Sequence, residues 1–181
     1  GPRHSPPDAI NMIFRQIYAM NPWTVCLLML LTFAGWTVLC NCLRAKVRIA
    51  VNVILFCVSA TIILHATLLS RTPRIYTAVL TPFAALAAAR QQPELYREML
   101  MNVFLFFPLG LTLSNALSRT WHRWRRLALT TLTGCVLSAG IEYAQYRFAL
   151  GMAETDDVIC NTLGAFVGAS SLLLAHAMEK H

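Results

Sequence analysis

The chain has 181 residues, of which 57% are hydrophobic and only 13% are charged, and its mean hydropathy is +0.56. A soluble globular domain has about a quarter of its residues charged, so this composition excludes an ordinary soluble domain and indicates a membrane protein. The length suits one domain, and the net charge of +7 suits an anionic lipid surface and not nucleic acid.

Five apolar runs predict membrane-spanning helices, because a helix needs about 20 residues to cross a hydrocarbon layer of about 30 Å. In chain order the runs cover residues 23–43, 49–69, 99–118, 127–146 and 158–178. A shorter run at 75–89 contains Pro82 and predicts a re-entrant or interfacial helix that does not cross, so that Arg74 and Arg90 stay on one side. The predicted fold is an all-α bundle of about five transmembrane helices plus this sixth element, in a single domain over 23–178.

Two short basic loops predict the orientation of the bundle. Residues 44–48 (RAKVR) and 119–126 (RTWHRWRR) fall on the same side of the membrane if the spans are as drawn. The positive-inside rule makes that side cytoplasmic. We therefore expect a bacterial cytoplasmic membrane protein with the N-terminal segment 1–22 outside the cell and the C-terminus inside. The dipeptide Gly1-Pro2 is typical of the scar that tag removal leaves.

A group of polar side chains lies between the last two predicted spans. Its members within residues 141–168 are Glu142, Gln145, Arg147, Glu154, Asp156, Asp157 and Asn161. Charged groups near hydrocarbon are costly and therefore rare without a structural or functional reason. Gly151 is expected as the turn residue of this loop, and Thr155 or Asp156 as the cap of the last span. Capping accounts for one or two of the acids but not for three together.

Glu142 is the first candidate for a working acid, because it lies about one helical turn inside the outer end of its span. Gln145 and Tyr146 follow three and four residues later and share its face. The structural alternative is a glutamate that these two neighbours hold by hydrogen bonds.

The last span carries a second polar face that begins at Asp157. The face continues through Asn161, Gly164 and Gly168, and a pair of glycines four residues apart lets another helix approach closely. We expect Asp157 and Asn161 to meet Glu142 and Asn102 in one small pocket of the outer leaflet.

The third span provides the partner helix for this pocket. Asn102 lies near its outer end, and Pro108 and Gly110 lie deeper, where a proline kinks a helix and frees a carbonyl. Arg71 and Arg147 lie at the level of the acids. A rim of arginine, carboxylate and amide groups suits a phosphate or carboxylate headgroup.

Three stretches match the pattern of a known family in order and spacing, namely NVFLFFPLG (102–110), EYAQ (142–145) and DDVICNTLGAFVG (156–168). They resemble the VanZ-like family of small bacterial membrane proteins, and the resemblance covers about residues 70–175. It implies a cell-envelope protein similar to one linked with low-level resistance to the glycopeptide teicoplanin. The resemblance brings a phenotype and no settled reaction.

One departure from the family's pattern concerns an arginine. The family commonly has an arginine shortly before the acidic pair, where this chain has Met152 and Ala153. Either Arg147 takes its place or the role is absent.

Four functions fit these observations. The protein binds or modifies a lipid or cell-wall precursor headgroup, with binding residues Asn102, Gln145, Arg147, Asp156, Asn161 and Arg71. Alternatively, it is a membrane-embedded hydrolase or transferase that acts on a lipid phosphate or acyl ester through Glu142 and Asp157. A divalent cation at Glu142, Glu154, Asp156 and Asp157 would serve such an enzyme. The third function is a carrier, which the lack of a visible inverted repeat disfavours. In the fourth, the polar groups only pack and cap helices.

Overall fold

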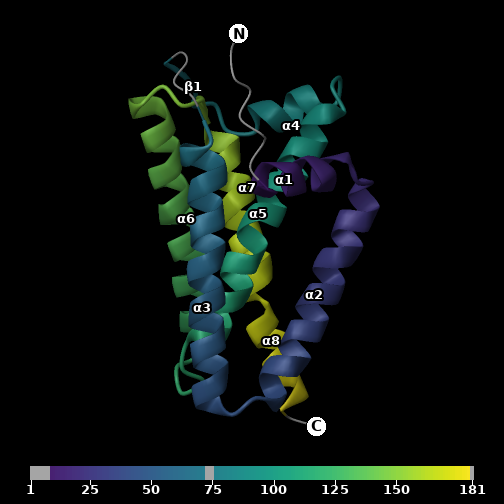
Figure 1. Cartoon of the computed structure of the whole chain (residues 1–181), viewed down its shortest axis with the longest axis vertical. Helices are drawn as coiled ribbons and strands as arrows, with labels where there is room; N and C mark the ends of the chain where they lie inside the picture. The colour runs from purple at the N-terminus through teal and green to yellow at the C-terminus, as the bar shows by residue number, and fades with distance from the viewer. Residues whose placement is uncertain (1–8, 72–75, 180–181) are drawn as a thin grey trace.

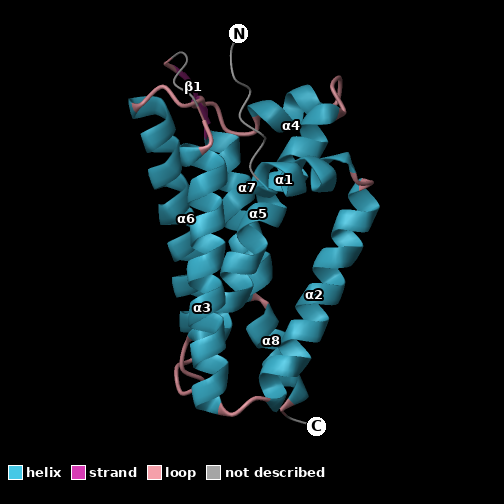
Figure 2. Ribbon diagram, viewed as in Figure 1, coloured by secondary structure: helices cyan, strands magenta, loops and turns pink. Residues whose placement is uncertain are grey.

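The computed structural model of the chain describes residues 9–71 and 76–179, and five of its helical segments are long and apolar enough to cross a membrane (Figures 1 and 2). These segments are α2 (Pro22–Cys42), α3 (Ala45–Leu64) with the π-helical turn η1 (His65–Leu69), α5 (Glu94–Ala116), α6 (Arg123–Arg147), and α7 (Thr155–Ala169) with α8 (Ser171–Met178). They confirm the predicted all-α membrane protein.

Helix α5 lies at the centre of the bundle, packed along α7 and flanked by α3 and α6 (Figure 1). Its buried side chains Phe106 and Leu109 form a core cluster with Ile63 of α3 and Ile141 of α6. Helix α5 continues through Pro108. Helices α3, α6 and α7 therefore pack along α5, and their ends lie near one another at the two ends of the bundle.

Helix α2 leans away from the other spans at one end and meets α8 at the other (Figure 1). Its start follows from local chemistry, because Pro22 occupies the first turn and the Asn21 side chain accepts a hydrogen bond from the backbone N–H of Trp23 (2.9 Å). A helix that was not predicted, α1 (Ala9–Ala19), lies across the end of the bundle. The Arg97 guanidinium of α5 stacks over the Tyr18 ring of α1 (5.6 Å).

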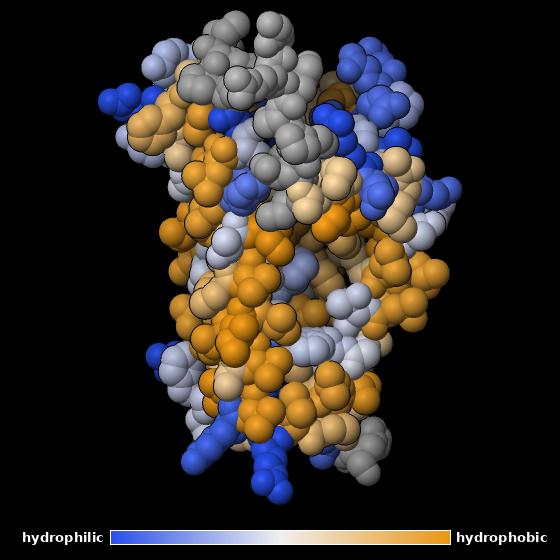
Figure 3. All heavy atoms as spheres, in the orientation of Figure 1, coloured by the Kyte–Doolittle hydropathy of each residue, from blue (hydrophilic) through white to orange (hydrophobic). Residues whose placement is uncertain are grey.

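The sides of the bundle are covered by apolar side chains, as Figure 3 shows between the more polar ends. Leu30 on α2 and Ile54 on α3 are each 62% exposed, and Val136 on α6 is 63% exposed. Such continuous apolar exposure is unfavourable in water and is what lipid contact requires. The outer faces of these helices are therefore the lipid-facing surface of a membrane protein.

Helices α5 and α7 pack backbone to backbone through glycines. A Cβ atom on Gly164 would collide with the carbonyl oxygen of Val103, and one on Gly168 with the carbonyl oxygen of Phe107. A Cβ atom on Gly110 of α5 would in turn collide with the backbone of α7. Helix α5 is thus the helix that approaches the glycine face of the last span.

The last span is two helices and not one. Helix α7 ends at Ala169 and α8 begins at Ser171, with a turn at Ser170 whose hydroxyl donates to the carbonyl of Val167 (2.7 Å). Serines that bond to preceding carbonyls often bend helices. The Ser171 hydroxyl accepts a hydrogen bond from Asn115 of α5 (3.2 Å), which fixes the start of α8 in the core.

The run at 75–89 is not a single helix. Its described part forms the strand β1 (Thr77–Val79) and the six-residue helix α4 (Ala84–Ala89), which is too short to cross a membrane. Strand β1 pairs in parallel with β2 (Met152–Glu154), and this long-range pairing overrides the helical pattern of the run. Arg74 lies outside the described residues.

Candidate functional site

The candidate site lies at the end of the bundle where α6 ends and α7 begins. Here Glu142 of α6, Glu154 of β2 and Asp157 of α7 form a group that we call the carboxylate cluster. Asp157 accepts a hydrogen bond from the Asn102 side chain of α5 through Oδ1 (2.7 Å), and it acts electrostatically on Glu142. Antiparallel packing of α6 and α7 thus places Glu142 and Asp157 at the same depth.

Glu142 is 8% exposed, and its Oε2 accepts a hydrogen bond from the backbone N–H of Glu154 (3.0 Å). Gln145 and Tyr146, which share its helical face, contact other parts of the chain. Gln145 donates through Nε2 to the carbonyl of Thr67 in η1 (3.1 Å), and the Tyr146 ring packs edge-on against Tyr76. Among the described residues, Glu142 is therefore held by the backbone of β2 and not by hydrogen bonds from these two side chains.

Among the described residues, Arg71 is the arginine that acts on the carboxylate cluster. Its guanidinium interacts electrostatically with both Glu142 and Asp157 and lies against Gly151, where a Cβ atom would be only 2.7 Å from Nη1. Arg147 is exposed in the last turn of α6, where a cation favourably meets the helix dipole. Arg71, and not Arg147, is therefore the cation that the fold brings to the acids.

The loop before β2 turns differently from the prediction. Ala149 has the left-handed backbone conformation (φ 52°), whereas Gly151 does not have a positive φ. Gly151 instead gives space to the Arg71 side chain. Met152 and Ala153, which stand where the family has its arginine, are residues of β2.

In the part of the chain that the structure describes, acidic groups outnumber Arg71 around the cluster. Burial raises the pKa of the Glu154 carboxyl, and the nearby charges of Glu98 and Asp156 raise it further. Glu98 also acts on Asp157. Because like charges disfavour one another, this end of the site would attract a cation or a hydrogen-bond donor.

Asp156 serves a structural purpose. Its two carboxylate oxygens accept hydrogen bonds from the backbone N–H groups of Phe83 (2.5 Å) and Ala85 (2.6 Å) at the start of α4. Asp156 therefore caps α4, whereas its own helix α7 has Glu154 at the N-cap position without a side-chain cap. The prediction that Thr155 or Asp156 caps the last span is wrong.

Asn161 lies one turn further along α7 and belongs to a different contact. Its Nδ2 donates to the Ser138 hydroxyl of α6 (2.9 Å), and its buried Oδ1 makes no hydrogen bond with the described residues. Asn161 and Gln145 thus fasten α6 to its neighbours and stand apart from the Asn102–Asp157 contact.

The geometry gives no support to a divalent cation at Glu142, Glu154, Asp156 and Asp157. Within residues 9–71 and 76–179, no three His, Cys, Asp or Glu side chains are arranged to hold a metal ion. Asp156 in particular already uses both of its oxygens for α4.

In the described part of the chain, five helices long and apolar enough to span a membrane, with the buried Glu142 and the half-buried Asp157 at one end, define a polytopic membrane protein with a polar site near the membrane surface. Residues 23–176 match the VanZ/LLP1 family, and the chain belongs to this family. It is also 37% identical to Protein VanZ of Enterococcus faecium over 89 residues. That alignment covers 49% of this chain and 48% of the relative, so the match spans about half the length of the curated protein. No solved structure matches the chain.

The family assignment confirms the resemblance that the three stretches indicated. The protein is a VanZ-like membrane protein of the cell envelope.

Proposed function

We propose that the carboxylate cluster binds the polar headgroup of a membrane lipid or a lipid-linked cell-wall precursor. The observation that carries this proposal is the pair formed by the buried Glu142 and the half-buried Asp157 beside Arg71. Two separate parts of the chain hold the pair, since Asn102 of α5 binds Asp157 and the backbone of β2 binds Glu142. Holding charged groups there is costly, so a structural purpose alone is a weak account of it.

The mixture of charges suggests which headgroup fits. Carboxylates accept hydrogen bonds from ammonium and hydroxyl groups, and a guanidinium binds phosphate with two parallel hydrogen bonds. The proposed ligand therefore carries a phosphate for Arg71 and an amine or sugar hydroxyls for Glu142 and Asp157. By binding such a precursor, the protein would contribute to glycopeptide (teicoplanin) resistance. The family resemblance supports this contribution.

This proposal is tested by removing charge while keeping shape. Glu142→Gln keeps an oxygen that can accept the Glu154 N–H, and Asp157→Asn keeps one that can accept from Asn102. We expect each variant to fold normally and to lose the teicoplanin resistance that the parent gives a sensitive host, as measured by the inhibitory concentration. Headgroup binding, measured by native mass spectrometry with bacterial lipids, should weaken about tenfold or more, because a hydrogen bond to a charged group contributes about 1.5–3 kcal/mol.

The matched control is Glu94→Gln, which removes one negative charge from an exposed position in the first turn of α5. It should leave binding and resistance unchanged. Full resistance and full binding in both Glu142→Gln and Asp157→Asn would refute the proposal.

We propose that the protein lies in the bacterial cytoplasmic membrane with the carboxylate cluster at the outer leaflet. The α2–α3 and α5–α6 connections, which carry the basic sequences, lie at the end of the bundle opposite the cluster (Figure 1). The positive-inside rule supports a cytoplasmic position for that end.

Thiol labelling tests this orientation. In a background without the native cysteines, His122→Cys in the α5–α6 loop should react with a membrane-impermeant reagent only after the cells are permeabilised. Arg147→Cys, exposed at the other end, should react in intact cells. The opposite pattern of labelling would contradict the orientation.

A second candidate function is a hydrolase or transferase acting on a lipid phosphate or acyl ester. The electrostatic coupling of the buried Glu142 with the half-buried Asp157 favours it, because two coupled carboxylates can divide the tasks of general acid and general base. Turnover of a bacterial lipid extract by the purified protein, lost in Glu142→Gln, would support it. Binding without any turnover would leave headgroup binding as the function.

A further inference from the structure

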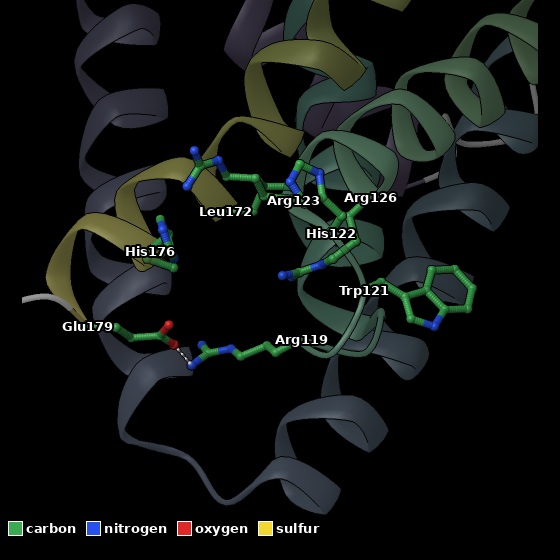
Figure 4. A pocket seen from close by; sticks show the side chains of 9 residues that line it. Arg119, Trp121, His122, Arg123, Arg126, Leu172, His176 and Glu179 are labelled. Carbon is green, nitrogen blue, oxygen red and sulfur yellow. Dashed lines mark hydrogen bonds and ion pairs between the residues drawn. The ribbon is translucent and has the colours of Figure 1, made fainter.

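A second polar site lies at the opposite end of the bundle, in a cavity of about 220 Å³ (Figure 4). The α5–α6 loop, the first turn of α6 and helix α8 surround it. Its polar lining consists of Arg119, His122, Arg123, Arg126, His176 and Glu179. The cavity is smaller than the roughly 300–1,000 Å³ typical of sites for drug-sized molecules, so it suits a small ligand.

Arg126 lines this cavity and carries an unused hydrogen-bond donor. The residue is only 7% exposed, and its Nη2 donates to the carbonyl of Ser114 near the end of α5 (2.7 Å). That bond explains part of the side chain, since cations commonly bind the last carbonyls of a helix. Its buried Nε, and likewise the buried Nε of Arg123, makes no hydrogen bond with any described residue. Buried donors without partners are rare in proteins, so these two require an acceptor.

The charges around the cavity are strongly unbalanced. Glu179 is its acidic lining residue, and it already forms an ion pair with Arg119 (2.5 Å; Figure 4). Arg48, 4% exposed, and Arg119 both repel Arg126 electrostatically. Like charges raise one another's free energy, and an anion in the cavity would relieve this cost for Arg119 and Arg126, which line it.

The backbone adds to the positive potential. Helix α6 has 25 residues and begins at Arg123, with His122 at its N-cap position and no side-chain cap. The first N–H groups of a helix and its dipole favour an anion at this end. The buried guanidinium groups and the helix start therefore act on the same small volume.

We propose that this cavity, which we call the basic cavity, binds a phosphate group. Guanidinium groups hold phosphate through paired, charge-assisted hydrogen bonds, and the unused Nε donors of Arg123 and Arg126 would supply part of them. The phosphate can belong to an anionic phospholipid headgroup at the membrane surface or to a small phosphate compound in solution. Both share the chemistry that the cavity recognises, and the site is separate from the carboxylate cluster.

The test measures thermal unfolding of the full chain with defined probes. In non-ionic detergent, the probe is inorganic phosphate or pyrophosphate, with sodium chloride at matched ionic strength as the reference. In nanodiscs, the comparison is phosphatidylcholine alone against phosphatidylcholine with phosphatidylglycerol. We expect at least one phosphate source to raise the unfolding temperature of the parent protein, with the response to dose giving an apparent affinity.

Arg126→Gln and Arg123→Gln should each weaken that affinity about tenfold or more, given the usual contribution of a charge-assisted hydrogen bond. If Arg126→Gln fails to fold because Ser114 loses its donor, Arg123→Gln still decides the question. The control is Arg125→Gln, which removes the same charge from the same turn, although Arg125 does not line the cavity and stacks on Trp121 (4.8 Å). It should keep the parent's affinity.

Stabilisation by phosphatidylglycerol alone would identify a lipid headgroup as the source, and stabilisation by free phosphate alone would identify a soluble ligand. Either result supports the basic cavity when Arg123→Gln weakens the affinity about tenfold or more. No stabilisation by any phosphate source would overturn the proposal. An equal loss of affinity in Arg125→Gln would also overturn it, because general attraction to a basic surface would then explain the binding.

Discussion

Replacing Gly164 by alanine should destabilise the protein by about 3 kcal/mol, the upper end of the usual range for overpacked cores. The added Cβ would collide with the carbonyl of Val103, and backbone atoms cannot rotate away as the end of a flexible side chain can. Helices α5 and α7 would have to separate. Gly168→Ala should behave similarly because its Cβ would collide with the carbonyl of Phe107.

The measurement is the free energy of unfolding in detergent micelles. Gly140→Ala is the matched control. Gly140 lies on the neighbouring helix α6, and a Cβ atom there would meet nothing within 4 Å. That substitution should raise stability by about 0.5–1 kcal/mol, as alanine is the better helix former. Equal stabilities of Gly164→Ala and Gly140→Ala would show that the α5–α7 contact is looser than described.

Asp156→Ala should detach the segment around α4 from the bundle. The backbone N–H groups of Phe83 and Ala85 would lose their acceptors, and a lost hydrogen bond to a charged group costs about 1.5–3 kcal/mol. Phe83 has a left-handed backbone (φ 62°), which is unfavourable for an aromatic residue and needs such support.

Backbone hydrogen exchange measures this effect directly. Exchange at Phe83 and Ala85 should accelerate roughly 30-fold, which corresponds to a local loss of about 2 kcal/mol. Asp156→Asn, which keeps one carbonyl oxygen as an acceptor, should give an intermediate rate. Unchanged exchange in Asp156→Ala would mean that other contacts hold α4.

The spans could be predicted from the sequence because the membrane imposes their length on the chain. Each apolar run has to be long enough to cross the hydrocarbon layer, and a charged loop ends each run at the membrane surface. The turn at Ser170 could not be predicted in this way, since α7 and α8 together form one continuous apolar run. Helix α1 was missed because its eleven residues are too few for a span.

The candidate site was only partly predictable from the sequence. Helical spacing placed Glu142 and Asp157 on faces that could meet, because a short loop joins their helices. Asp156 contacts Phe83, and β1 pairs with β2, across more than 70 positions of the sequence. No local sequence pattern predicts such long-range contacts. The choice of Arg71 over Arg147 depends on the same long-range pairing, which brings Arg71 to the loop before β2.

We propose above that a lipid headgroup occupies the carboxylate cluster. The most direct test of this proposal is an experimental structure of the protein in nanodiscs made from bacterial lipid extract. We expect headgroup density bounded by Arg71, Glu142 and Asp157, and loss of this density in Glu142→Gln with the helices unmoved. Lipid density confined to the apolar sides of the bundle, with water alone between Arg71 and the two carboxylates, would contradict it.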